Sequence, residues 1–290
     1  MAKSLLDLMN DMNDFDDKVS SRVEYIKSGF CWPGSKQKSL SNILDKLPIR
    51  NGFIEVFGGS GAVTLNRPVS KFQVFNDANS GVVAFFRTIR DPEKLERFID
   101  FINLTPHARE EFCDFKRDWV DELDDVIKAC KFYYCAQTSF HGEMRVFGRT
   151  RSGLSNTIKK LQNKIELLPV IADKFLSIQI ENLDWRVCLK DFDNKDAVFY
   201  LDPPYVDKNC YKHKMSHEDH HEMCRRIMQM DGFVALSGYD NDIYGEYDWD
   251  HIYSWEVKEN YTDQMFNTDR ENKMKGQSRG VGHEHLWIKE

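Results

Sequence analysis

Four consecutive residues, Asp202-Pro203-Pro204-Tyr205, have the types and spacing to bind a small polar group. They follow the apolar run at 197–201, which predicts a buried strand. The prolines end that strand because proline lacks an N–H and keeps the preceding residue extended. The turn offers the Asp202 carboxylate, the Pro203 carbonyl and the Tyr205 ring, which together suit a planar group that carries an amine, such as a nucleobase edge. The alternative is a rigid turn with a solvated aspartate, and the other motifs of the chain weigh against it.

A glycine-rich loop earlier in the chain is the second motif that indicates a ligand site. The stretch 52–63 reads as strand, glycine turn and helix, with the turn at Phe57-Gly58-Gly59-Ser60-Gly61. A second strand at 72–76 is followed by Asp77, which is placed to bind a ribose diol. The glycines are not spaced as Gly-x-Gly-x-x-Gly, so the loop favours a nucleoside over a pyrophosphate.

The remaining elements predict an α/β fold with a doubly wound, mostly parallel sheet that is interrupted once. Helical periodicity runs from about 79 to 135, and helices are also expected over about 38–46 and from Ser216, which begins a capping-box pattern. Apolar or alternating runs predict further strands at 175–180, 182–185, 232–237, 251–257 and 285–288. In such sheets, ligands bind at the carboxyl ends of the strands.

Composition restricts the classes of function. A chain of 290 residues that is 41% apolar and 30% charged is ordinary for a soluble globular protein, and it has no apolar run near the roughly 20 residues that span a bilayer. The seven scattered cysteines lack a Cys-x-x-Cys pair, which argues against a disulfide framework or a zinc site and favours a reducing cytosol. The four histidines between 213 and 221 lack the spacing of a zinc enzyme, so no metal site is predicted.

One basic segment could meet a nucleic acid, although the net charge of −7 gives no general support to such binding. After the helix breaks at 137–145, no acid occurs between Glu143 and Glu166. A solvated loop face is the alternative, but polar and aromatic residues are interleaved with the cations, which favours contact with phosphates and base edges. The candidate DNA-binding residues are Ser139, Arg145, Arg149, Arg151, Lys159 and Lys160.

In this order, the glycine loop, the basic segment and the Asp-Pro-Pro-Tyr turn resemble the Dam-like (D12 class) adenine-specific DNA methyltransferases, from about Phe30 to the C-terminus. Trp32-Pro33-Gly34-Ser35-Lys36 is similar to the family's Trp-Ala-Gly-Gly-Lys segment, with Pro and Ser as departures. The segment 137–145 keeps the outline of the family's recognition motif but changes its polar positions, which leaves the target sequence open.

The resemblance implies a Rossmann-like methyltransferase sheet with an inserted, mainly helical target-recognition subdomain. Residues 1–28 would be an acidic N-terminal extension, 29–88 with 165–290 the catalytic domain that binds S-adenosylmethionine, and 89–164 the inserted target-recognition domain. The implied cofactor residues are Trp32, Lys36, Phe57, Gly58, Gly59, Gly61, Asp77, Asp184, Trp185 and Asp202. The implied catalytic residues are Asp202, Pro203 and Tyr205.

The resemblance also implies the reaction: transfer of a methyl group from S-adenosylmethionine to N6 of an adenine that has left double-stranded DNA. Asp202 and the Pro203 carbonyl would accept the amine hydrogens, and the extruded base would stack on Tyr205. We expect a monomer or weak dimer in the cytoplasm of a prokaryotic or phage-infected cell, without a membrane partner. The alternatives are a catalytically silent module that binds DNA or S-adenosylmethionine, an RNA adenine N6-methyltransferase, and a nicotinamide-dependent oxidoreductase, which the absent phosphate loop disfavours.

Overall fold

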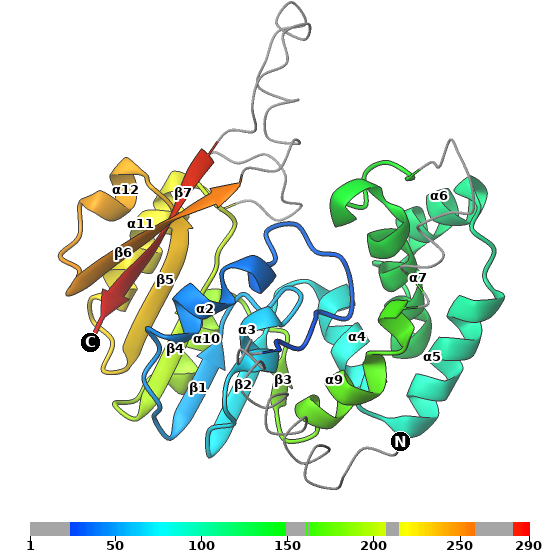
Figure 1. Cartoon of the computed structure of the whole chain (residues 1–290), viewed down its shortest axis with the longest axis horizontal. Helices are drawn as coiled ribbons and strands as arrows, with labels where there is room; N and C mark the ends of the chain where they lie inside the picture. Colours follow the sequence, from blue (N-terminus) through cyan, green and yellow to red (C-terminus); the bar gives the residue numbers. More distant parts are fainter. Residues whose placement is uncertain (1–23, 149–160, 162, 207–214, 259–280) are drawn as a thin grey trace, which may run out of the picture.

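The computed structural model describes residues 24–148, 161, 163–206, 215–258 and 281–290, which form a seven-stranded sheet beside a group of helices (Figure 1). The strands are β1 (Gly52–Glu55), β2 (Phe72–Asn76), β3 (Gln179–Glu181), β4 (Ala197–Leu201), β5 (Phe233–Tyr239), β6 (His251–Lys258) and β7 (Val281–Lys289). They lie in the order β3-β2-β1-β4-β5-β7-β6, and of these strands only β7 runs against the others. The predicted doubly wound, mostly parallel sheet is confirmed.

Helices cover both faces of the sheet. They are η1 (Lys36–Lys38), α2 (Leu40–Leu44), α3 (Ala62–Asn66), α4 (Ser80–Ile89), α5 (Pro92–Leu104), α6 (Arg109–Asp118), α7 (Asp125–Thr138), η2 (Phe140–Gly142), α9 (Leu168–Phe175), α10 (Trp185–Phe192), α11 (His217–Ile227) and α12 (Asp242–Gly245). One face of the sheet packs on α10, α11 and α12, and the other packs on α2 and α3. Within the described residues, no helix has both the length and the apolar character of a membrane span.

The central strands are apolar because they are covered on both sides. All five residues of β4 are buried: Phe199 and Leu201 pack with α10 and α11, while Val198 and Tyr200 pack with α2 and α3. A strand of a parallel sheet that is buried on both faces reads as a continuous apolar run, which is how β4 stands out in the sequence. This packing holds the end of β4, and therefore the Asp202 turn, in a fixed place.

The helices α5, α6 and α7 stand to the right of the sheet in Figure 1, and α4 lies between them and the strands. Aromatic rings of α4 connect these helices to the helices beside the sheet. Phe85 of α4 stacks on Tyr133 of α7 at 5.7 Å between ring centroids, and Phe86 of α4 stacks on Phe175 of α9 at 4.1 Å. Phe75 of β2 belongs to the same apolar cluster. The inserted helices are therefore packed on the sheet through one continuous core.

One strand prediction is only partly right and another is wrong. The strand predicted at 175–180 forms only at its end: α9 runs to Phe175 and puts it in the core with Leu168 and Ile171 at helical spacing, and β3 begins at Gln179. The segment 182–185 is not a strand, because β3 ends at Glu181 and the Asp184 side chain caps α10. In both places the alternation of polar and apolar residues is outweighed by a helical face or a cap.

Candidate active site

The loop after β1 and the turn after β4 lie next to each other at the carboxyl edge of the sheet. β1 and β4 pair in parallel, with Glu55 opposite Tyr200, while β1 also pairs with β2 and β4 with β5 on the other side. This is the switch point of a doubly wound sheet, where ligands bind. A cavity of about 310 Å³ opens here, a volume within the range of small-molecule sites.

Most residues predicted to bind the cofactor line this one cavity. They are Trp32, Lys36, Phe57, Gly58, Gly59, Asp77, Asp184, Trp185 and Asp202. Gly61 does not line it, and with φ of 69° it instead occupies the left-handed position from which α3 begins. Among the predicted catalytic residues, Asp202 faces the cavity, Pro203 is buried, and the half-buried Tyr205 packs edge-on against Tyr239.

The glycine loop requires glycine at two positions because aromatic side chains press on it. Gly59 has φ of 50°, and a Cβ there would lie 2.5 Å from Trp32 Nε1. A Cβ at Gly58 would lie 2.2 Å from the Phe75 ring. Neither contact can be accommodated by a real side chain. The loop and Trp32 therefore form a single close-packed wall of the cavity.

Asp77 ties the glycine loop to β2. Its Oδ2 accepts the Gly59 N–H at 2.7 Å and its Oδ1 accepts the Asn79 N–H at 2.7 Å. Burial raises the pKa of Asp77 to about 6, although both hydrogen bonds oppose the rise. A carboxylate held rigidly on the cavity wall retains lone pairs that can accept hydrogen bonds from ligand hydroxyls.

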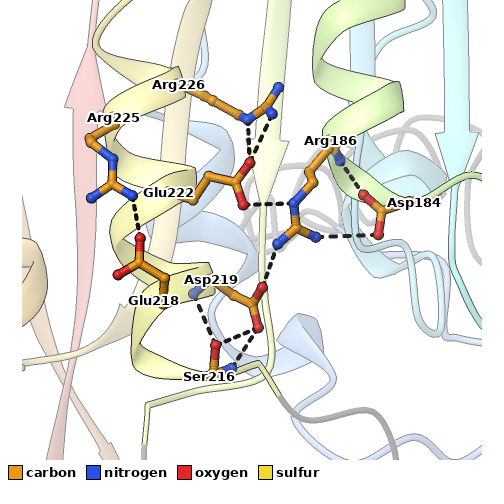
Figure 2. Close-up of polar contacts among 8 residues, drawn as sticks. All are labelled: Asp184, Arg186, Ser216, Glu218, Asp219, Glu222, Arg225 and Arg226. Atoms are coloured by element: carbon orange, nitrogen blue, oxygen red, sulfur yellow. Dashed lines mark hydrogen bonds and ion pairs between the residues drawn. The ribbon is translucent and has the colours of Figure 1, made fainter.

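The start of α10 forms another wall. Asp184 accepts the Arg186 N–H at 2.8 Å, and the Arg186 guanidinium carbon lies 4.3 Å from the centroid of the buried Trp185 ring. Arg186 also pairs with Asp184 at 3.4 Å, with Glu222 at 2.7 Å and with Asp219, which lie on or beside α10 and α11 (Figure 2). These contacts fasten the Trp185 wall to the helix that follows the Asp202 turn.

The first turn of α11 carries the predicted capping box, which is confirmed between Ser216 and Asp219. Hydrogen bonds from the Ser216 backbone and side chain, assisted by Arg186, lower the pKa of Asp219 to about 2 despite partial burial. Asp219 is therefore ionised at any pH at which the protein would function, and it supplies Arg186 with a permanent partner.

Lys36 places one positive charge between two buried carboxylates. Its Nζ lies 2.6 Å from Asp202 Oδ1 and 3.2 Å from Glu284 Oε1, and it donates to the Tyr205 hydroxyl at 2.5 Å. The side chains of Lys36, Asp202 and Glu284 are 6%, 18% and 7% exposed. Burial raises the pKa of Asp202 to about 6, with Lys36 opposing the rise and Glu284 adding to it. We call these four residues the Lys36 cluster.

Of the predicted DNA-binding residues, Ser139 and Arg145 lie in the described part of the chain. Both belong to a tight turn at 139–148, where Arg145 is exposed. Ser139 Oγ accepts the Met144 N–H at 3.0 Å and lies 3.3 Å from the Ala136 carbonyl, so this hydroxyl shapes the turn. The candidates that lie outside the described residues are Arg149, Arg151, Lys159 and Lys160.

The same turn reaches the cavity, which the sequence analysis does not predict. Gly142, Glu143 and Met144 line the cavity. Gly142 has φ of 77°, and a Cβ there would lie 2.7 Å from the Cys31 carbonyl oxygen. The turn of the inserted segment is thus seated against the stretch that carries Trp32, so the predicted DNA-binding block and the cofactor wall are in direct contact.

Two buried acids of the site are also absent from the sequence prediction. Glu55 ends β1, accepts the Thr64 N–H at 3.0 Å, and has its pKa raised by burial to about 8. Glu284 lies on β7, on the same face as the core residues Leu286 and Ile288. An acid in phase with the apolar residues of a strand is a signal that could have identified Glu284.

Comparisons with known proteins identify a family and several relatives. The family model of the D12 class N6 adenine-specific DNA methyltransferases matches residues 32–262. The modification methylase StsI of Streptococcus sanguinis is 29% identical over 203 residues, covering 65% of this chain and 30% of that protein. The type II methyltransferase M.CviBI of Paramecium bursaria Chlorella virus NC1A is 28% identical over 182 residues, covering 60% of this chain and 67% of that protein.

A third relative is the DNA N-6-adenine-methyltransferase of Escherichia phage P1, which is 28% identical over 134 residues, covering 44% of this chain and 17% of that protein. The chain therefore spans less than a third of the StsI methylase and of the phage P1 enzyme, and about two thirds of the viral one. The family match covers most of the chain, including the glycine loop, Asp77, the Asp184-Trp185 wall and the Asp202 turn. The chain belongs to the D12 class N6 adenine-specific DNA methyltransferases.

Proposed function

We propose that the chain transfers a methyl group from S-adenosylmethionine to N6 of adenine in a specific sequence of double-stranded DNA. The observation that carries this proposal is that Asp202, at the end of β4, faces the same cavity as the glycine loop and Asp77. A carboxylate that can accept an amine therefore stands beside a wall that suits a nucleoside. The predicted domains and the expected cytoplasmic setting are part of the same proposal.

The residues of the cavity fit S-adenosylmethionine. Asp77 would accept the ribose hydroxyls, Trp185 would pack on the adenine, and Trp32 with the glycine loop would enclose the remainder. Two acids of the Lys36 cluster against one cation leave a net negative charge, which suits a cationic ligand. When bound, S-adenosylmethionine supplies an electrophilic methyl group on a positively charged sulfur.

Asp202 would act on the amine that is methylated. The N6 lone pair of adenine is delocalised into the ring, so the nitrogen is a weak nucleophile. As a carboxylate, Asp202 accepts a hydrogen bond from this amine and stabilises the positive charge that develops on the nitrogen in the transition state. With a pKa of about 6, Asp202 is ionised at neutral pH and remains a stronger base than an exposed aspartate.

The target base would have to leave the duplex to reach Asp202, which costs a few kcal/mol. Stacking of the extruded base on Tyr205 would offset part of that cost, by about 1–3 kcal/mol. Arg145, exposed on the turn that touches the cavity wall, would contact DNA close to the extruded base. Arg149, Arg151, Lys159 and Lys160 follow it in sequence and would add phosphate contacts.

The test is to supply the full chain with S-adenosylmethionine carrying an isotopic methyl label, together with duplex DNA or structured RNA. The nucleosides are then released and separated. We expect label in N6-methyldeoxyadenosine from duplex DNA and none from RNA. Label in RNA alone would favour the RNA methyltransferase, and binding of both ligands without transfer would favour a silent binding module.

A further inference from the structure

Glu284 is the one buried acid of the Lys36 cluster that lies far from the cavity motifs in sequence. Its Oε1 accepts the Tyr205 hydroxyl at 2.9 Å, and its Oε2 accepts the Ser39 hydroxyl at 2.7 Å. The Ser237 hydroxyl lies 3.4 Å from Oε1. Four groups from η1, the β4 turn, β5 and the start of α2 therefore meet on one carboxylate of β7.

Because of the position of Glu284, the ammonium group of Lys36 is shared between two carboxylates. Lys36 Nζ lies 2.6 Å from Asp202 and 3.2 Å from Glu284, so a single ammonium group serves two carboxylates in a buried site. If Asp202 were its sole partner, Lys36 would hold the Asp202 lone pairs strongly and weaken them as acceptors. A second acid on the other side of the ammonium group reduces that hold.

We propose that Glu284 is a positioning residue that holds Lys36 and the Tyr205 hydroxyl on β7 and thereby keeps Asp202 a strong acceptor for the target amine. This role rests on the proposed function and deepens it, because it adds a residue to the machinery around Asp202. In this role, Glu284 touches neither the base nor the cofactor. It acts through Lys36 and Tyr205.

The charges around Asp202 support this role. The titratable groups that face or influence Asp202 are Lys36, Glu55, Tyr200, Tyr205, Tyr244 and Glu284. Tyr200 and Tyr244 are neutral in the working pH range because burial raises their pKa, and Glu55, whose pKa is raised to about 8, is mostly protonated near pH 6. The net pKa of Glu284 is lowered, because Lys36 and the hydroxyl donors outweigh its burial. Among these groups, Glu284 is therefore the acid that is negatively charged while Asp202 titrates, and its charge raises the pKa of Asp202.

The test uses Glu284→Gln in the full chain, with Ser39→Ala as the matched control. The glutamine keeps the size of the side chain but removes its charge, whereas Ser39→Ala removes one hydrogen bond to the same carboxylate and leaves every charge in place. The direct measurement is a carbon-13 NMR titration of the Asp202 carboxyl, with aspartate labelled selectively and the signal assigned from Asp202→Asn.

In the wild type we expect the Asp202 midpoint near pH 6. In Glu284→Gln we expect the Asp202 midpoint to fall by about one pH unit. A like charge is lost, and Lys36 no longer shares its charge with the Glu284 carboxylate. In Ser39→Ala it should not move. In methyl-transfer assays, the acid limb of the kcat profile should fall with the midpoint, and kcat at pH 8 should drop about tenfold, while KM for S-adenosylmethionine changes little.

The result that overturns this role is an Asp202 midpoint that stays at the wild-type value in Glu284→Gln. An equal loss of kcat in both variants, with an unmoved acid limb, would show that Glu284 is only structural. These outcomes are separate from failure of the proposed function. A wild-type chain that methylates no adenine would end that proposal, yet the titration would still report whether Glu284 sets the charge state of Asp202.

Discussion

In the described part of the chain, two ion-pair networks border the same cavity: the Lys36 cluster and the contacts of Arg186 shown in Figure 2. In the Lys36 cluster, Lys36 and Glu284 are buried and Asp202 is 18% exposed, and burial raises the pKa of Asp202 to about 6. Arg186 is 32% exposed among three acids, and hydrogen bonding lowers the pKa of Asp219 to about 2. One network keeps an acid close to its titration point, and the other keeps an acid permanently ionised.

The difference shows that a basic residue among several acids has different effects in a buried and in a partly exposed setting. Water stabilises the surplus negative charge around Arg186, so that network can act as a structural fastener at little cost. Inside the protein, a surplus charge is unfavourable, and the Lys36 cluster retains one only because it is held by packed strands. A basic, desolvated carboxylate is what the proposed chemistry at Asp202 requires. In the proposed mechanism the buried network therefore serves the chemistry, and the exposed network supports the cavity wall that carries Trp185.

Removal of the shared cation should have the largest effect on stability. Lys36→Met keeps the length of the side chain but leaves Asp202 and Glu284 as unpaired buried acids, so we expect a loss of about 3–5 kcal/mol in the free energy of unfolding. The loss should be greater at pH 8 than at pH 5, because protonation at the lower pH relieves the repulsion. Urea unfolding at both pH values measures it, and a loss that is small and equal at both would mean that the cluster is not electrostatically coupled.

The pH dependence of stability tests the electrostatic cost of burying an acid at this site, because Glu55 is buried beside the cavity. Its folded pKa of about 8 lies above the usual value, so the folded state keeps a proton that the unfolded chain has already lost between about pH 4.5 and 8. Stability conferred by this group is therefore full at low pH and is lost as pH rises toward 8. Glu55→Gln should flatten that decline and be more stable than the wild type at pH 8, by up to a few kcal/mol. Melting temperatures from pH 5 to 9 would reveal it, and parallel curves for the two proteins would refute it.

The exposed network should yield a smaller effect. Arg186→Met loses contacts with three acids, for which we expect about 1 kcal/mol in the free energy of unfolding. The control is Arg225→Met, which loses a pair with Glu218 whose side chains are 52% and 77% exposed. That change should be close to neutral. The midpoints of urea unfolding compare the two variants. Equal midpoints would show that the ion pairs of Arg186 do not stabilise the contact between α10 and α11.

The sequence predicts the central part of the site because local signals mark it. Asp202 and the glycine loop follow apolar runs that end in proline or glycine, and Asp77 directly follows the strand β2, so each lies at a strand end. Parallel strands bring these ends to one edge of the sheet. The start of the strand predicted at 175–180 is wrong for the opposite reason: Phe175 fits both an alternating and a helical pattern, and only packing selects the helix, so that β3 begins at Gln179.

Glu284 could not be linked to the site in this way. Its partner Ser39 lies 245 residues earlier in the chain, and nothing local to β7 indicates which side chains it meets. The antiparallel pairing of β7 with β5 decides that, because it carries Glu284 opposite Tyr239, close to the end of β4 and its turn. Long-range register is the information that residue types and spacing do not contain.

In the proposed mechanism, the Asp202 carboxylate activates the adenine amine inside a cavity that binds S-adenosylmethionine. The most direct test compares wild type and Asp202→Asn in the yield of N6-methyldeoxyadenosine from duplex DNA, with calorimetry of S-adenosylmethionine binding on the same samples. We predict that Asp202→Asn loses about 100- to 1,000-fold in kcat while it still binds S-adenosylmethionine. Methylation by Asp202→Asn at the wild-type rate would contradict this mechanism.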